Sequence, residues 1–495
     1  MGQMRFLISP PDRLTEEVLQ LAYMSGLDRT PWLVRVKADG PALTVDRSVS
    51  DSGSLTIPWH VEGHGLLGLS TGTLIERLEP YRLPLELARG AINQLRAHLF
   101  EWQAIGLAVP RPVGEKLHAA VEQFSAAVVD QAEPAAGVQA QAALRLALDA
   151  SQLLAGAYAE QVIGFRRRSS GKLPTLLGGD LAGPMLENGT AAQFLAAFNA
   201  ARVPMPWSEV EAMEGRFAWS AIDSQIDWCR AQGLKVCAGP LVQLDARGLP
   251  DWAYLWEDDF DNLAAAAGEF VQAAVQRYRG KVDLWQCAAR INSTDLLALT
   301  EEENLRLAAS LLHLVGQLDP ETPLAISIDQ PWGEYMGRRA CDFPPLHFAD
   351  ALVRARLDLK ALMLEINLGC FRGATMPRSE LELSRLLDYW SLLGLPLWVS
   401  LTIPSSDADD PAAVRKMKIP AGSWNLESQQ VWTSRYVPMI LAKPGVQAVY
   451  WNQFRDIPGH DFPNAGLMND HRQAKPALRT LTTIRSACLT PTKAE

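Results

Sequence analysis

ALMLEIN (361–367) and LPLWVSLT (395–402) are two short apolar runs, and the stretch between them, SELELSRLLDYWSLL (379–393), has the spacing of an amphipathic helix. Both runs are too apolar to alternate with polar residues, which is typical of strands that are buried on both faces of a parallel sheet. Gly394 directly follows the helical stretch, where a left-handed C-cap favours glycine. This part of the chain therefore predicts a strand, a helix and a second strand parallel to the first.

The same pattern extends over the rest of the C-terminal two thirds of the chain. Further strand-like runs lie at 174–180, 198–204, 234–241, 282–288, 323–329 and 446–452, and amphipathic stretches lie at 219–232, 260–278 and 302–318. Eight alternating units over roughly 300 residues are typical of an α/β fold of the (β/α)8 TIM barrel type. A doubly wound open sheet has the same alternation, and we favour the closed barrel over it.

The first 170 residues have a different pattern. Residues 1–80 mix short strand-like runs with turn residues, which predicts a small β-rich module of the sandwich or jelly-roll kind. Such a module is either a carbohydrate-binding accessory or a structural cap on the barrel. Residues 81–168 predict a helical segment, and the barrel follows at 169–495, with FRRRSSGKLP (165–174) as a linker. The apolar content of the long helix at 138–165 requires a partner surface, so residues 1–165 are expected to dock on the barrel; a homodimer is a further option.

Composition limits the classes of function. The net charge is −10 and the only basic run is Arg166–Arg168, which argues against nucleic acid and anionic membranes as partners. The N-terminus has no apolar segment of a secretory signal, and no apolar stretch is long enough to span a membrane, so a cytoplasmic location is expected. The six cysteines form no C-x-x-C pair, which indicates reduced thiols. The histidines lack metal spacing, the nearest pair being His60 and His64, so neither a metal nor another cofactor is expected.

Several motifs resemble the family 10 glycoside hydrolases, the xylanase family. They are FNAARVPMPW from residue 198, EGRFAWSAIDSQIDWCRAQGLKV from 214, LPDW (249–252), VQAVYWNQFRD (446–456) and AGLMNDHRQAKPAL from 465. The resemblance covers about residues 175–485, with all eight strands in order. It implies a barrel that handles oligo- or polysaccharides at the C-terminal ends of its strands.

The positions at which the resemblance implies catalytic glutamates carry other residues. The strand-4 position is Cys287, between Gln286 and Ala288, and the strand-7 position is Leu401, between Ser400 and Thr402. A retaining glycosidase needs two carboxyl groups about 5–5.5 Å apart, one of them protonated. Neither a thiol nor an isobutyl group can take these roles, so ordinary retaining xylanase activity is not expected.

The active residues of such a barrel lie at the C-terminal strand ends. If there is catalysis, the candidates are the carboxylates near strands 5 and 6, which are Glu365, Asp329 and Glu334. Amide, aromatic and charged side chains could hold sugar hydroxyls and stack on sugar faces. The candidates for substrate binding are Asn199, Arg202, Trp207, Gln286, Cys287, Trp332, Tyr335, Asn367, Trp451, Asn452 and Arg455.

Glu365 is the central candidate, because it is a glutamate embedded in a predicted strand. A desolvated Glu365 beside another carboxylate, such as Asp329, would have its pKa raised, which is how an acid and a base are made from two like groups. The alternative, which we favour slightly, is that Glu365 pairs with Arg202 or Arg290 and only braces the barrel or holds a sugar hydroxyl.

Two classes of function remain open at this point. One is a divergent glycoside hydrolase whose catalytic carboxylates have moved to strands 5 and 6. The other is a sugar-binding protein that kept the cleft and lost catalysis, and a purely structural scaffold is a third, less favoured option.

Overall fold

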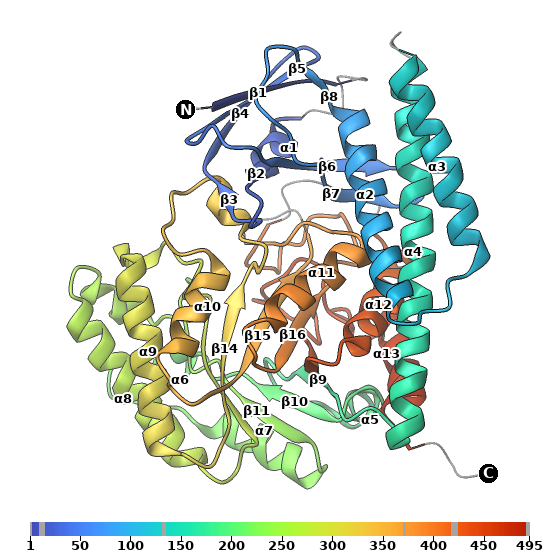
Figure 1. Ribbon diagram of the computed structural model, residues 1–495. Helices are drawn as coiled ribbons and strands as arrows, with labels where there is room; N and C mark the ends of the chain where they lie inside the picture. Colours follow the sequence, from blue (N-terminus) through green and yellow to red (C-terminus); the bar gives the residue numbers. More distant parts are fainter. Residues whose placement is uncertain (1, 9–14, 131–134, 370–372, 417–423, 492–495) are drawn as a thin grey trace.

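The computed structural model describes residues 2–8, 15–130, 135–369, 373–416 and 424–491. Its C-terminal part is a closed parallel barrel (Figure 1). The barrel strands are β9 (Leu176–Asp180), β10 (Ala200–Val203), β11 (Lys235–Ala238), β13 (Leu284–Ala289), β14 (Leu324–Asp329), β15 (Leu359–Asn367), β16 (Leu397–Thr402) and β17 (Val446–Trp451). Parallel pairing of β9 with β17 and of β11 with β13 closes the ring, and the short β12 (Val242–Gln243) extends it at β13. The closed barrel is thereby confirmed, and the open sheet is excluded.

Helices surround the barrel in the order that the sequence predicts. They are α5 (Asn188–Ala197), α6 (Trp207–Val210), α7 (Ser220–Ala231), α8 (Phe260–Tyr278), α9 (Glu301–Leu318), α10 (Pro345–Arg354), α11 (Glu380–Ser391), α12 (Leu426–Ala442) and α13 (Pro476–Cys488), with short 3-10 helices η2 (Asp251–Trp256), η3 (Leu296–Ala298) and η4 (Glu334–Gly337) in the loops. Thr300 and Glu303 form a capping box that fixes the start of α9. The four predicted helices between strands are confirmed as α7, α8, α9 and α11.

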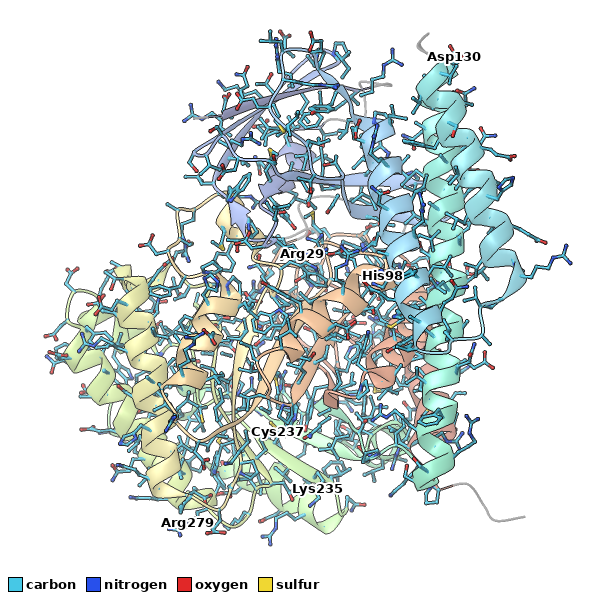
Figure 2. All side chains as sticks on the ribbon, in the orientation of Figure 1. Arg29, His98, Asp130, Lys235, Cys237 and Arg279 are labelled. Carbon is cyan, nitrogen blue, oxygen red and sulfur yellow. The ribbon has the colours of Figure 1, made fainter. Side chains whose placement is uncertain are left out.

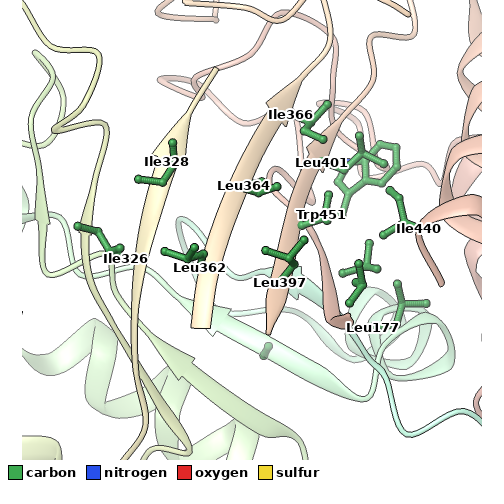
Figure 3. Close-up of a cluster of buried hydrophobic side chains, with 14 of the residues drawn as sticks. Leu177, Ile326, Ile328, Leu362, Leu364, Ile366, Leu397, Leu401, Ile440 and Trp451 are labelled. Atoms are coloured by element: carbon green, nitrogen blue, oxygen red, sulfur yellow. The ribbon is translucent and has the colours of Figure 1, made fainter. Parts of the chain in front are cut away.

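Two apolar layers hold the barrel together. The layer between strands and helices contains Ile326, Leu364, Leu401 and Trp451 (Figure 3). The other layer fills the barrel itself, with small residues such as Ala200, Ala325 and Ala448 beside Met363, Trp398 and Tyr450. Because successive side chains of a strand point to opposite faces, each barrel strand contributes to both layers. Only the strand-end residues on the inner face can reach the mouth of the barrel.

The N-terminal part contains two small sheets. One has the order β4 (Val34–Asp39), β5 (Ala42–Arg47), β1 (Gly2–Leu7), β8 (Tyr81–Arg82), and the other has the order β3 (Pro31–Trp32), β2 (Tyr23–Ser25), β6 (Ser54–Val61), β7 (Gly65–Ser70). Pairing is antiparallel except between β1 and β8. Both sheets contribute to one core, for example Phe6 and Val45 from the first and Ile57 and Trp59 from the second, with α1 (Glu16–Leu21) adding Val18. Alternating burial along β1 and β5 agrees with a two-layer β-rich module.

Three long helices connect this module to the barrel. α2 (Leu83–Ala104), α3 (Arg111–Val129) and α4 (Ala135–Ser170) pack on one another, and α4 also packs on α12 and α11. In Figure 1, α4 runs along one side of the molecule from the β-rich module to the barrel. Because α4 continues to Ser170, the expected linker at 165–174 is wrong over its first six residues, which are the last turns of the helix.

The N-terminal part docks on the barrel, as its apolar surface requires. The backbone N–H of Gly68 in β7 donates to the carbonyl of Pro377 at 2.7 Å. Glu382 of α11 accepts from Arg29 at 3.2 Å and from Gln94 of α2. Arg29 lies where the β-rich module meets the barrel (Figure 2). In the described part of the chain, no helix has the length and apolarity that a membrane span needs.

Candidate functional site

The direction of each strand-end side chain follows from the alternation along the strand. Met363, Trp398 and Tyr450 belong to the core inside the barrel, so Glu365, Ser400 and Asn452, each two residues further on, also point inward. By the same rule Cys287 and Trp451, together with Leu401, point outward, and all three are buried in the layer between strands and helices. The prediction that Cys287 and Trp451 face a ligand at the mouth is therefore wrong.

A buried arginine lies at the centre of the mouth. Arg290 directly follows β13 and adopts a left-handed backbone conformation, with φ at 62°. Its guanidinium forms ion pairs with Glu365 (Nε to Oε2, 3.4 Å), with Asp461 (3.1 Å) and with Asp245. Arg290 is only 5% exposed, so these pairs are largely shielded from water. The side chain links strand β15 to the loops that follow β12 and β17.

The same cluster contains two further arginines. Arg247 lies 3.4 Å from Asp461, and Arg415 lies 3.5 Å from Asp245. Burial acts to raise the pKa of Asp461, but Arg290, Arg247 and Arg415 together lower this pKa to about 2. Asp461 is therefore ionised at any ordinary pH.

A second buried arginine spans the barrel beside the first. Arg202 of β10 donates from Nε to Asp180 of β9 at 2.8 Å, and it also donates to Asn452 at the end of β17. Its Nη1 lies 3.4 Å from the hydroxyl of Ser400 on β16. Arg202 thereby links β10 to β9, to β16 and to the end of β17.

Glu365 and Asp329 lie side by side on adjacent strands, since they are partners in the register of β14 and β15. Glu365 accepts from Asn367 at 3.3 Å in addition to Arg290, and Asp329 accepts from the hydroxyl of Ser293 at 2.9 Å. Burial raises the pKa of Asp329 to about 6, and the negative charge of Glu365 adds to this rise. The raised pKa is that of Asp329, the register partner of Glu365.

A cavity of about 390 Å³ opens at this end of the barrel, between the ends of β9, β10 and β17 and the start of α7. Its volume lies within the range of roughly 300–1,000 Å³ that is usual for small-ligand sites. Six of the predicted site residues line it, namely Arg202, Trp207, Gln286, Glu365, Asn452 and Arg455.

Two lining residues have their polar groups engaged in holding the structure. Trp207 donates from Nε1 to Glu211 at 2.7 Å and stacks on Phe270, with ring centroids 5.6 Å apart. Arg455 donates from Nη2 to the carbonyls of Ala182 and Pro184, in the loop that follows β9. Both side chains therefore shape the cavity wall as well as face it.

The remaining candidates lie outside the lining of this cavity. Glu334 accepts from Arg378 at 3.1 Å, and Arg378 also donates to the hydroxyl of Tyr23 in the β-rich module at 2.9 Å. The guanidinium of Arg378 lies 4.8 Å from the centre of the Trp332 ring. Glu334 and Trp332 thus belong to the contact between module and barrel.

Three further candidates make structural contacts. Asn199 precedes β10, and its Oδ1 accepts from the backbone N–H of Leu177 at 2.8 Å, so its predicted place at the C-terminal end of a strand is wrong. Asn367 accepts from Thr402 and from Asn452 at the mouth. Tyr335 accepts weakly from Asn292 at 3.4 Å, and burial raises its pKa.

Sequence reasoning missed several residues that build the mouth. Arg247, Asp245, Arg415 and Asp461 lie on long loops with no periodic pattern, so nothing in the sequence brings them together. One signal could have indicated them: a buried Arg290 needs carboxylate partners. Among the described residues, no group of three or more His, Cys, Asp or Glu side chains could hold a metal ion; Cys370 lies outside these residues.

The closed parallel barrel with a polar mouth at the C-terminal strand ends makes this part of the chain a (β/α)8 barrel. Residues 187–295, which run from α5 to the loop after β13, match the family model of Glycosyl hydrolase family 10. The resemblance to this family is thereby confirmed, and the barrel is a family 10-like barrel.

Three solved xylanase structures are similar to the chain. Xylanase 10B from Thermotoga maritima is 14% identical over 65% of this chain and 98% of its own, with a TM-score of 0.48. Xylanase 10B from Thermotoga petrophila RKU-1, solved with xylobiose, is 14% identical over 67% of this chain and 96% of its own, with a TM-score of 0.47. Xylanase XynB from Paenibacillus barcinonensis is 14% identical over 65% and 97%, with a TM-score of 0.48. No curated protein matches the chain.

Proposed function

We propose that the barrel mouth binds an oligo- or polysaccharide and does not hydrolyse it. The observation that carries this proposal is the ion pair between Arg290 and Glu365. Glu365 is the one member of the predicted catalytic trio that lines the cavity, and its carboxylate is held by a buried cation. A carboxylate held in this way braces the barrel and holds a sugar hydroxyl more readily than it attacks a sugar carbon.

The protonation of the other carboxylates supports the loss of hydrolysis. Glycosidases need one protonated carboxyl group to donate to the leaving oxygen and one ionised group opposite it. At the cavity, Asp461 is ionised because its pKa is about 2, and Asp180 is paired with Arg202. Asp329, whose pKa of about 6 suits an acid, lies outside the cavity lining and is engaged by Ser293. Asp461 is therefore a poor proton donor, and Asp180 and Glu365 are each held by an arginine.

The composition of the cavity wall supports sugar binding. The amides of Gln286, Asn452 and Gln453 offer planar donors and acceptors of the kind that pair with sugar hydroxyls. Phe454 and Met205 give an apolar wall for the carbon face of a sugar ring. The combination of a few polar groups with an apolar wall is typical of a small-ligand site.

A panel of soluble oligosaccharides tests this proposal, with xylo-oligosaccharides first because of the family match. Each sugar is titrated calorimetrically, and the same samples are assayed for new reducing ends. We expect saturable binding of at least one sugar without release of reducing ends. Release that is lost in Glu365→Gln would overturn the proposal.

One observation favours a second candidate, a hydrolase with relocated carboxylates. Asp329 and Glu365 are register partners, and the pKa of Asp329 is raised to about 6 in part by Glu365. Such a pair resembles an acid and a base made from two like groups. In this case, both Asp329→Asn and Glu365→Gln would abolish the release of reducing ends while sugar binding remained.

For the β-rich module at residues 1–80 we propose the role of a structural cap. The support is the buried set of contacts in which Arg378 of the barrel joins Tyr23 of the module to Glu334. A module that acts as a separate sugar-binding accessory has no need of such a buried connection. Loss of sugar binding by a chain with substitutions only on the exposed faces of the module would contradict this role.

A further inference from the structure

We infer that the cavity prefers an acidic sugar, a uronic acid unit whose carboxylate is held by Arg455 while one of its hydroxyls donates to Gln286. This inference rests on the proposed function and adds the chemical class of the ligand. It depends on two polar atoms of the cavity wall that find no hydrogen-bond partner within the protein.

The first of these atoms belongs to Arg455. Its Nη2 donates to two backbone carbonyls, of Ala182 at 2.9 Å and of Pro184 at 2.5 Å. Its Nε is buried and has no hydrogen-bond partner. Because carbonyl oxygens carry no net charge, these contacts position the guanidinium and leave its positive charge in place.

No carboxylate in the described part of the chain pairs directly with Arg455, although two carboxylates influence it from a longer distance. They are Asp180 and Glu187. Asp180 is engaged by Arg202 at 2.8 Å, and Glu187 is engaged by Arg472. A half-buried cation without its own anion is unfavourable, and an anionic ligand reduces that cost.

The second atom is Oε1 of Gln286, which also lines the cavity. Gln286 is fully buried inside the barrel, and its Nε2 donates to the hydroxyl of Ser327 at 2.6 Å. This contact fixes the orientation of the amide and leaves Oε1 without a hydrogen-bond partner. A buried acceptor of this kind requires a donor such as a hydroxyl group.

The two atoms together select the ligand. Arg455 favours a negatively charged group and Gln286 favours a hydrogen-bond donor. A uronic acid carries both groups on one ring. A neutral sugar leaves the charge of Arg455 unmatched. An anion without a hydroxyl group, such as sulfate or acetate, offers no donor to Gln286.

The neighbouring helix adds to the preference for a carboxylate. α7 begins with Ser220 and Ala221 at the cavity wall, and no side chain caps its first turn. Free N–H groups at a helix N-terminus favour negative charge nearby. Gln225 of the same helix donates to Leu181 and Gly183, so α7 and Arg455 hold the same loop.

The test compares an acidic disaccharide that contains glucuronic acid with its carboxyl-reduced neutral counterpart, by calorimetric titration of the full chain. We expect the acid to bind about ten- to a hundredfold more tightly, as is usual for hydrogen bonds to charged groups. Acetate and inorganic phosphate at the same concentrations should not displace it. Arg455→Gln should remove the preference, while Arg455→Lys, which keeps the charge, should retain part of it.

Arg111→Gln is the control, because Arg111 is an exposed arginine of α3 that pairs with Glu115 and lies outside the cavity lining. This variant should keep the full preference. Equal binding of the acid and the neutral sugar by the unmodified chain overturns this inference and leaves the proposed function standing. Binding of neither sugar, nor of any other sugar of the panel, overturns both. Displacement by acetate alone would show a carboxylate site without sugar recognition and would also overturn it.

Discussion

The Nε of Arg290 lies 3.4 Å from Oε2 of Glu365, inside the barrel and near the centre of its mouth. Arg290 follows β13 and Glu365 belongs to β15, so this pair crosses the strand that lies between them, β14. The same guanidinium holds Asp461 and Asp245 on separate loops. Glu365 is therefore one of three carboxylates that pair with Arg290, and these ion pairs fix the shape of the cavity.

Glu365→Gln should lower the free energy of unfolding by about 1–3 kcal/mol. Arg290 keeps Asp245 and Asp461 as partners, so the loss should be smaller than for a buried cation left alone. Urea unfolding at neutral pH measures the effect. Glu209→Gln is the control, since Glu209 is exposed at the cavity wall, and it should change the stability by less than about 0.5 kcal/mol. Equal stability of Glu365→Gln and the unmodified chain would show that Glu365 does not brace the barrel.

The change in the free energy of unfolding that Asp329→Asn causes should be more favourable at pH 7 than at pH 3.5. The carboxyl group of Asp329 has a pKa of about 6 in the fold, against 3.8 in an unfolded chain. Between these values the unfolded chain loses its proton first, so the stability of the unmodified protein falls as the pH rises from about 4 to 6. The asparagine variant lacks this fall, and the difference between the two pH values should be about 2–3 kcal/mol. A difference independent of pH would contradict the raised pKa.

Asp461→Asn should show the opposite dependence on pH. Its pKa is about 2 in the fold, so its ionised form contributes stability that is complete above the unfolded value near 3.8 and is lost as the pH falls through 2. The variant should be less stable than the unmodified protein by about 2–3 kcal/mol at pH 7, with a smaller deficit at pH 2.5. Urea unfolding of this variant and of Asp329→Asn at both pH values shows whether the two variants have opposite dependences of stability on pH.

The apolar pattern of the strands was sufficient to predict the barrel. β15 and β16 were expected at 361–367 and 395–402, and their apolar side chains fill both layers of the core. The pattern was insufficient for the direction of single side chains at strand ends. Gln286 faces the cavity and Cys287 faces the helices, and a shift of one residue in register exchanges them.

The charge network of the mouth could not be predicted either. Asp461 and Asp245 reach Arg290 from loops far apart in the sequence, and no local pattern encodes such contacts. Glu334 was expected at the mouth because it follows β14 closely. It pairs instead with Arg378, because the N-terminal module covers this part of the loop.

Gly178→Ala should destabilise the barrel by about 1–3 kcal/mol, the usual cost of overpacking a core. A Cβ at Gly178 would lie 2.3 Å from the ring of Tyr450, which is fully buried inside the barrel. The control is Gly156→Ala in α4, where a Cβ meets no atom within 4 Å. That variant should gain up to about 1 kcal/mol, because alanine is the better helix former. Thermal unfolding of both variants measures the contrast, and a neutral Gly178→Ala would contradict the packing of the barrel interior.

Arg378 connects the β-rich module to the barrel. Arg378 is 1% exposed and donates to both Tyr23 and Glu334. Arg378→Met leaves Glu334 buried without its cation, and the loss of stability should be about 3–5 kcal/mol. Tyr23→Phe removes a single hydrogen bond and should cost about 1 kcal/mol. If the module docks through this contact, both variants should also make the module more accessible to proteolysis in the order Arg378→Met, then Tyr23→Phe. Removal of the residues before 170 exposes the faces of α11 and α12 that α4 covers. A barrel from residue 170 onward that is still as soluble and as stable as the full chain would therefore show that docking contributes nothing.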